Sequence, residues 1–165
     1  MPRRSSRPID PYTYALAALA RRELTSAQLA DRLARRGYEQ AIINDVLARL
    51  RTEGALDDRR AAWAVARTAV QVKRQGRWRV RQELDRLGVD RETAAEVLEE
   101  VLGSTDETEL VERALSARLR GSIQDRGHFE RLYRYLIRQG FRSEQAVAVL
   151  RRHASNRPAA DVAGE

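Results

Sequence analysis

Three glycines recur along this chain at an interval of about 51 residues, each within the same helical pattern. Gly37, Gly88 and Gly140 each follow a leucine by four positions and precede an apolar residue. Matching apolar residues stand eight positions before each glycine and nine and ten positions after it. Intervals of this length are typical of repeat proteins, whose units pack against themselves and their neighbours. The sequence therefore predicts three copies of one helical module.

Each copy contains three segments of helical periodicity, and no segment shows the alternation typical of a strand. We expect an all-α fold in which three tandem three-helix repeats form an elongated array, with its curvature left open. The second repeat should have the longest first helix. The expected boundaries are a flexible basic arm at 1–9, repeats at 10–54, 55–103 and 104–154, and a flexible tail at 155–165.

Local signals place several helix starts. Thr25 with Gln28 matches a capping box, in which each residue satisfies a backbone N–H of the other. Ser104 with Glu107 matches a second one. These pairs predict that helices begin directly after Thr25 and Ser104.

Other signals concern the second and third repeats. Either Asp57 or Asp58 should cap the first helix of the second repeat, where negative charge suits the helix dipole. Ile42 and Val72 fall on apolar helix faces and are expected in the core. The longest internal loop is expected at 121–127, between two glycines.

The composition favours a polyanionic partner. The chain of 165 residues has 31 basic and 24 acidic residues, a formal net charge of +7, and only one lysine, Lys73. Arginine binds phosphate and carboxylate in a bidentate manner, although GC-rich coding bias also explains an arginine excess. The chain has no cysteine, no apolar run long enough to span a bilayer and no signal-peptide core. A cytoplasmic location is expected.

The sequence carries no recognisable catalytic or metal-binding pattern. His128 and His153 are the only histidines, and neither has a cysteine or carboxylate pair at ligand spacing. No phosphate-binding P-loop motif is present. We therefore expect a binding protein without catalytic residues, metal or cofactor.

Charge is unevenly distributed along the chain. Residues 73–81 contain five basic residues and no acid, whereas residues 92–112 contain eight acids and no base. An ordinary solvated helix face mixes both signs, so the stretch at 73–81 is either a partner contact or an unusual piece of surface.

Two segments carry a resemblance to a known family. The first is Gly54-Ala-Leu-Asp-Asp58, with an arginine later in the same helix, and the second runs from Gly76 to Gly88. Over roughly residues 12–153 the chain resembles the RecX family of bacterial regulatory proteins. The residues that match the family motifs are Gly54, Leu56, Asp57, Asp58, Arg67, Gly76, Glu83, Leu84 and Gly88.

The chain departs from the family pattern at three positions. Ala61 replaces an aromatic residue, which Trp63 could compensate from a neighbouring position. Arg77 replaces the proline after the glycine, and Leu87 stands where lysine is common. The loss of proline should loosen the turn at Gly76.

The resemblance implies tandem three-helix modules and a non-enzymatic modulator, usually an inhibitor, of the RecA recombinase. Members of the family are similar in binding along the groove of the RecA filament on single-stranded DNA. There they reduce ATP hydrolysis, strand exchange and the stimulated self-cleavage of the LexA repressor. The expected partner is therefore RecA and its filament, with direct DNA contact also open, and the chain itself is expected to be a monomer.

Basic residues are the expected contacts with this partner. In order of preference they are Lys73, Arg74, Arg77, Arg79 and Arg81, then Arg134, Arg138 and Arg142, then Arg35 and Arg36. Trp78 could stack on a base, cover an apolar contact or anchor the core of the second repeat. Two alternatives stay open: a nucleic-acid-binding helical module that needs no filament, and a helical scaffold for an unrelated protein.

Overall fold

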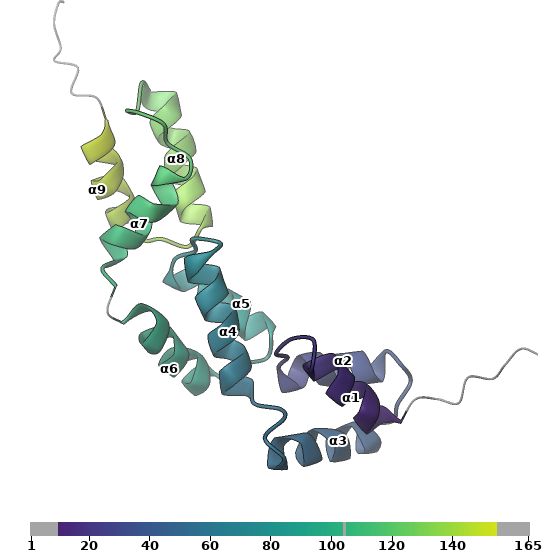
Figure 1. The fold of residues 1–165 in the computed structure, drawn as a ribbon. Coiled ribbons are helices and arrows are strands. Elements are labelled where there is room, and N and C mark those ends of the chain that lie inside the picture. The colour runs from purple at the N-terminus through teal and green to yellow at the C-terminus, as the bar shows by residue number, and fades with distance from the viewer. Residues whose placement is uncertain (1–9, 104, 155–165) are drawn as a thin grey trace, which may run out of the picture. The chain divides into compact units, whose positions relative to one another are not determined.

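The structure, a computed structural model, describes residues 10–103 and 105–154. The predicted arm at 1–9, the tail at 155–165 and Ser104 lie outside the described residues. Within the described ranges the regular structure is helical, as predicted, apart from one isolated bridge between Ile123 and Ala154 (Figure 1). The described helices are α1 (Pro11–Leu19), α2 (Ser26–Ala34), α3 (Gln40–Thr52), α4 (Asp58–Gln71), α5 (Arg77–Arg86), α6 (Arg91–Leu102), α7 (Glu107–Ser116), α8 (Arg126–Arg138) and α9 (Ser143–His153).

Contacts divide the chain into two compact units. The first unit is Met1–Thr68 with Arg81–Val101, and the second is Ala69–Val80 with Leu102–Glu165. Helices α4 and α5 therefore contribute residues to both units.

In the first unit, helices α1, α2 and α3 pack against one another in all three pairs. The capping box at Thr25 and Gln28 is confirmed, with hydrogen bonds of 3.0 and 3.2 Å that start α2. The apolar side chains of these helices meet in one cluster, and its buried members are Ala15, Ala18, Leu24, Leu29, Leu33, Ile43, Val46, Leu47, Leu50 and Leu56.

In the second unit, helices α7, α8 and α9 pack in the same pairwise way. The predicted capping box at Ser104 and Glu107 is wrong, because Asp106 caps α7 by accepting from the backbone of Thr108. Asp125 caps α8 and accepts from the His128 N–H at 2.7 Å, so this helix begins inside the loop expected at 121–127. Buried residues of this unit include Leu110, Val111, Ala114, Leu115, Ile123, Leu132, Leu136, Phe141, Ala146, Val149 and Leu150.

Two predicted core residues are exposed. Val72 is 72% exposed because α4 ends one residue before it, at Gln71. Ile42 is 41% exposed because its neighbour Ile43 takes the position that faces the core of the first unit. Neighbouring helix positions point in different directions, so Ile43 can face the core while Ile42 does not.

The recurrent glycine turns make close backbone contacts, and the first such junction lies in the first unit. The Thr25 hydroxyl donates to the Leu87 carbonyl at 2.6 Å, just before the turn at Gly88. A Cβ added to Gly88 would lie 2.6 Å from the Ala27 Cβ. Only glycine lets this turn, with its φ of +72°, approach the start of α2 so closely.

The second junction lies in the second unit and joins the corresponding positions, with a backbone N–H as the donor in place of a hydroxyl. The Gly76 N–H donates to the Gln139 carbonyl at 2.8 Å, just before the turn at Gly140. A Cβ added to Gly140 would lie 2.4 Å from the backbone nitrogen of Arg79. Thr25 and Gly76 are one repeat interval apart, so the same turn contacts the same position of the preceding middle helix in both units.

The end of α3 carries a polar contact that makes stability depend on pH. The Tyr12 hydroxyl donates to the Glu53 carboxylate at 2.5 Å, and Arg49 donates to the same carboxylate at 2.8 Å. The Tyr12 hydrogen bond and then the Arg49 guanidinium lower the pKa of Glu53, and the bond to Glu53 raises the pKa of Tyr12. A lowered folded-state pKa stabilises the folded protein above the pKa of the unfolded chain, and that contribution disappears as the pH falls.

We therefore predict that Tyr12→Phe weakens the dependence of stability on pH in the acid range. The unfolding free energy of the native chain should fall between about pH 5 and pH 3, where a carboxyl group normally takes up its proton. Without the Tyr12 hydroxyl, the Glu53 pKa should move back towards its ordinary value and this decline should be shallower. Urea unfolding at several pH values measures the free energy of unfolding of both proteins. An equal decline of this free energy with falling pH in the two proteins would contradict the prediction.

Candidate functional site

The basic segment, residues 73–81, lies at the loop between α4 and α5 and on the first turns of α5. Lys73 and Arg74 occupy the loop, whereas Arg77 and Arg79 stand in the first turn of α5, which has no acidic residue. The start of a helix carries a partial positive charge, so cations there are locally unfavourable. The helix dipole therefore does not favour this arrangement.

Trp78 is 59% exposed, so the alternative that it anchors a core is wrong. Arg74 is also exposed and has a φ of 55°, the only positive φ of any described residue besides glycine. Such backbone conformations cost on the order of 1–3 kcal/mol and cluster at functional sites. Arg74 forms no ion pair or hydrogen bond through its side chain with the part of the chain that the structure describes, which leaves the guanidinium available to a partner.

The second junction brings the basic segment to the predicted basic residues of the third repeat. Arg138 is the last residue of α8 and Arg142 directly precedes α9, so both flank the turn that contacts Gly76 and Arg79. Arg142 is paired with Glu107 at 3.9 Å, and Arg134 is exposed one turn earlier on α8. The basic segment and the turn between α8 and α9 are about 60 residues apart in the sequence, yet their backbones are in contact at the second junction.

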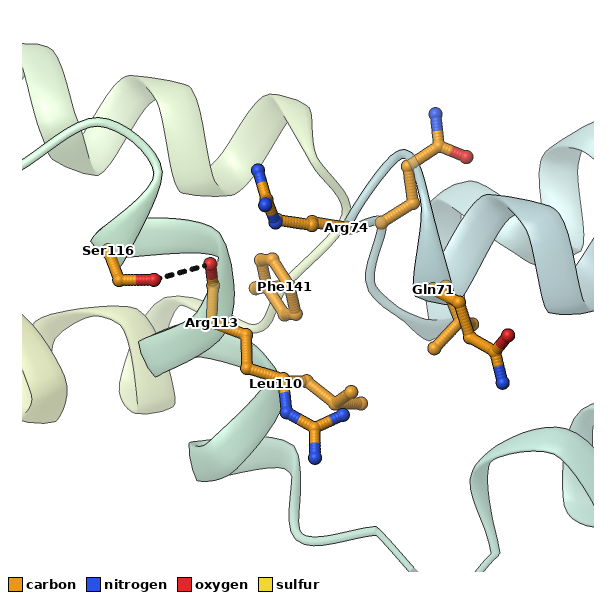
Figure 2. A pocket seen from close by; sticks show the side chains of 8 residues that line it. Gln71, Arg74, Leu110, Arg113, Ser116 and Phe141 are labelled. Carbon is orange, nitrogen blue, oxygen red and sulfur yellow. Dashed lines mark hydrogen bonds between the residues drawn. The ribbon is translucent and has the colours of Figure 1, made fainter.

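A hollow of about 420 Å³, the Arg74 hollow, lies beside this junction within the second unit. Figure 2 shows the Arg74 side chain extended along one side of the Phe141 ring, with Leu110 on the other side. The lining residues are Val70, Gln71, Arg74, Gln75, Leu110, Arg113, Ser116 and Phe141. The Gln75 Oε1 is buried and has no hydrogen-bond partner among the described residues. The hollow thus presents an unpaired cation and apolar walls, whereas the Gln75 acceptor is buried.

This combination suits an acidic segment of a protein. A carboxylate could pair with Arg74 in a bidentate manner, while apolar side chains of the segment could lie against the apolar walls. Phe141 is only 4% exposed, so it offers no free ring face on which a nucleobase could stack. Arg113 is already paired with Glu109 on its own helix.

The remaining predicted contact residues belong to the first unit. Arg81 pairs with Asp85 at 3.2 Å, and Arg35 pairs with Asp31 at 2.9 Å. Arg36 stacks on the Tyr14 ring, 4.1 Å from its centroid. Two of these three cations are thus partly neutralised within the chain.

The family-motif residues hold the fold together. Asp57 caps α4 by accepting from the Arg60 N–H at 3.0 Å. Asp58 instead reaches α2, where it accepts from the Ser26 N–H at 2.5 Å and from the Ser26 hydroxyl at 2.6 Å. Leu56 and Leu84 are buried.

Other motif residues have equally local roles. Gly54 has a φ of +71°, and the glycines at 76 and 88 belong to the two junctions. Arg67 lies over Trp63, 5.2 Å from its ring centroid. Trp63 is 37% exposed, so it does not fill the core at the buried Ala61.

Gln75 and Arg113 line the hollow but were not among the predicted contact residues. Arg113 lies on α7, far along the chain from the basic segment, and shares no local pattern with it. Gln75 is uncharged, so no signal in charge or spacing marks it. Only the folded structure shows that α7 and the end of α4 line the same hollow.

None of the described helices is both long and apolar enough to cross a membrane. Within 10–103 and 105–154, no group of three or more histidine, aspartate or glutamate side chains could hold a metal ion.

Known structures resemble this fold. A crystal structure of regulatory protein RecX matches with a TM-score of 0.70 and 18% identity, covering 86% of this chain and 70% of that one. The crystal structure of RecX from Lactobacillus salivarius matches with a TM-score of 0.65 and 16% identity, covering 88% and 95%. At these identities the likeness concerns the fold alone.

Sequence comparisons identify the family. A model described as the first three-helix domain of RecX matches residues 12–50, and one described as the second matches residues 57–98. Regulatory protein RecX of Geobacillus kaustophilus is 34% identical over 84% of this chain, which spans only 52% of that protein. Regulatory protein RecX of Halorhodospira halophila is 38% identical over 138 residues, which cover 81% of this chain and 82% of that protein. The chain therefore belongs to the RecX family of regulatory proteins.

Proposed function

We propose that this chain is a non-enzymatic modulator of a RecA recombinase, and that it acts as an inhibitor. In this proposal it binds in the groove of the RecA filament on single-stranded DNA and reduces ATP hydrolysis, strand exchange and stimulated LexA cleavage. Membership of the RecX family supports the regulatory role. The observation that carries the proposal is the Arg74 hollow, in which an exposed guanidinium without a partner among the described residues lies beside apolar walls.

The proposed contact surface consists of the Arg74 hollow, Trp78 and the arginines at the second junction. Arg74 would pair with an acidic side chain of the recombinase, and Trp78 would supply exposed apolar area. Tryptophan and arginine are the residues that most often dominate binding energy at protein interfaces. Arg138 and Arg142 would widen the positive surface around them.

The test is the ATPase rate of the cognate recombinase on single-stranded DNA, titrated with this protein. The variant Arg74→Ala/Trp78→Ala removes the exposed contact residues and leaves the junction backbone intact. If each residue contributes about 1–2 kcal/mol, half-inhibition should need roughly 30-fold or more additional protein. The native chain should inhibit well below one molecule per recombinase protomer.

The matched control is Arg126→Ala/Trp63→Ala, which removes the same residue types elsewhere. Trp63 is exposed on α4, and Arg126 is an exposed residue paired with Glu130 on α8. The control should inhibit like the native chain. An equal loss of inhibition in the two variants would contradict the proposed surface. A native chain without effect on the ATPase rate of the recombinase would contradict the proposed function.

A further inference from the structure

A second hollow, of about 400 Å³, lies in the first unit between α1 and α2. We call it the arginine hollow, and its lining residues are Thr13, Tyr14, Ala17, Ala18, Arg21, Arg32 and Arg36. Three of these residues are arginines, and none is acidic. Arg21 follows α1, Arg32 stands in the last turn of α2, and Arg36 follows α2, so the fold gathers cations that are up to 15 positions apart.

These three guanidiniums are not neutralised within the described part of the chain. Arg21 and Arg32 have no ion pair, side-chain hydrogen bond or ring contact with any described residue, and the contact of Arg36 is with the Tyr14 ring. Many other arginines of this chain have a carboxylate partner, as Arg35 does in Asp31, one residue from Arg36. Like charges that share one hollow without a counter-charge repel one another and attract an anion.

The other lining residues indicate which class of anion fits the arginine hollow. Tyr14, Ala17 and Ala18 offer mainly apolar surface, and the Thr13 hydroxyl already donates to Asp10 at 2.8 Å. Apart from the guanidiniums and the Tyr14 hydroxyl, the lining side chains offer no free polar group that could bind a peptide backbone. A sugar–phosphate backbone needs few such groups, because its anionic oxygens can bind guanidinium groups while its sugars lie on apolar surface.

We propose that the arginine hollow binds the phosphate backbone of a single-stranded nucleic acid. Arg21, Arg32 and Arg36 each contact a phosphate oxygen, and the apolar wall formed by Tyr14, Ala17 and Ala18 receives the sugar. The binding is independent of base sequence, since no base-reading group lines the hollow. This site involves other residues, on another unit, than the contact surface proposed for the recombinase, and either can fail without the other.

The experiment measures anisotropy of a fluorescent oligothymidylate, titrated with the full chain at several salt concentrations and without any recombinase. The variant Arg21→Ala/Arg32→Ala/Arg36→Ala removes three phosphate contacts. Each contact to a single strand contributes roughly 0.7 to the slope of log affinity against log salt. The slope should therefore become shallower by roughly 2, with a loss of affinity of at least about tenfold at low salt.

A control variant carries the same change in charge. Arg49→Ala/Arg126→Ala/Arg152→Ala removes three arginines that have carboxylate partners at 2.8, 3.0 and 3.9 Å and do not line the hollow. This control should keep most of the native slope. Thermal melting by circular dichroism shows that each variant folds. If the triple variant of the hollow does not fold, the double variant Arg21→Gln/Arg32→Gln replaces it and keeps the Arg36–Tyr14 stack. This double variant should lower the slope by roughly 1.4.

Three results would overturn the proposal. One is a native chain that does not bind the oligonucleotide at low salt. Another is an equal loss of slope in the two triple variants, which would show that net charge alone attracts the strand. A third is binding of polyglutamate that the hollow variant loses while its DNA binding stays native, which would assign the hollow to carboxylates of a protein.

Discussion

Replacing Gly140 with alanine should lower the free energy of unfolding of the second unit by about 2–4 kcal/mol. Gly140 has a φ of +88°, and a Cβ there would lie 2.4 Å from the backbone nitrogen of Arg79 and 2.5 Å from its Cβ. Neither atom is the end of a flexible side chain, so the α8–α9 turn would have to move away from α5. That movement would also stretch the 2.8 Å hydrogen bond from Gly76 to Gln139.

Gly37→Ala is the matched control for this substitution. Gly37 has nearly the same φ, +85°, but no described atom lies within 4 Å of a Cβ at this position. Alanine there should cost only the backbone strain, about 1 kcal/mol. Urea unfolding measures both losses. In a Trp63→Phe background the remaining Trp78 reports unfolding of the second unit by its fluorescence. In a Trp78→Phe background the remaining Trp63 reports unfolding of the first unit. Equal losses at the two glycines would show that the close contact has no energetic role.

Asp58→Ala should lower the free energy of unfolding of the first unit by about 2–4 kcal/mol. The Asp58 carboxylate accepts two short hydrogen bonds from Ser26, which is only 8% exposed. Alanine would leave the Ser26 N–H and hydroxyl without these partners, and an unsatisfied buried polar group typically costs about 1–3 kcal/mol. The substitution would also release the start of α4 from the start of α2.

The neighbouring Asp57 provides the control. Asp57→Ala removes a helix cap with one hydrogen bond to the Arg60 N–H, and such caps contribute about 1 kcal/mol. Urea unfolding followed by Trp63 fluorescence in the Trp78→Phe background should therefore rank Asp58 above Asp57. The reverse order would mean that the motif stabilises α4 alone and does not connect two helices.

The sequence predicts what is local in this fold. The capping box at Thr25 and Gln28 and the glycine turns at 37, 88 and 140 depend on residues within a few positions, and the structure confirms them. Ser104 and Asp106 show the limit of such signals. Both residues are good caps two positions apart, and the sequence does not decide between them.

The candidate site depends on packing that no local pattern encodes. Charge density pointed to Arg74, but not to its unusual backbone or to the hollow it shares with Gln75 and Arg113. Likewise, Arg36 was predicted from its charge, whereas Arg21 and Arg32 share its hollow only because α1 packs on α2. Contacts between helices that are distant in the sequence leave no local pattern, so only the structure shows them.

The two glycine junctions have a consequence for how chain length in this family can change. Each junction joins a backbone carbonyl of the turn to the start of a middle helix, through the Thr25 hydroxyl in the first and the Gly76 N–H in the second, at positions one repeat interval apart. A duplicated or deleted stretch of about 51 residues would restore the same junction, whereas any other insertion would displace the turn from its helix. We therefore expect length differences among relatives to accumulate in whole-repeat steps, with gene duplication rather than loop growth as their source.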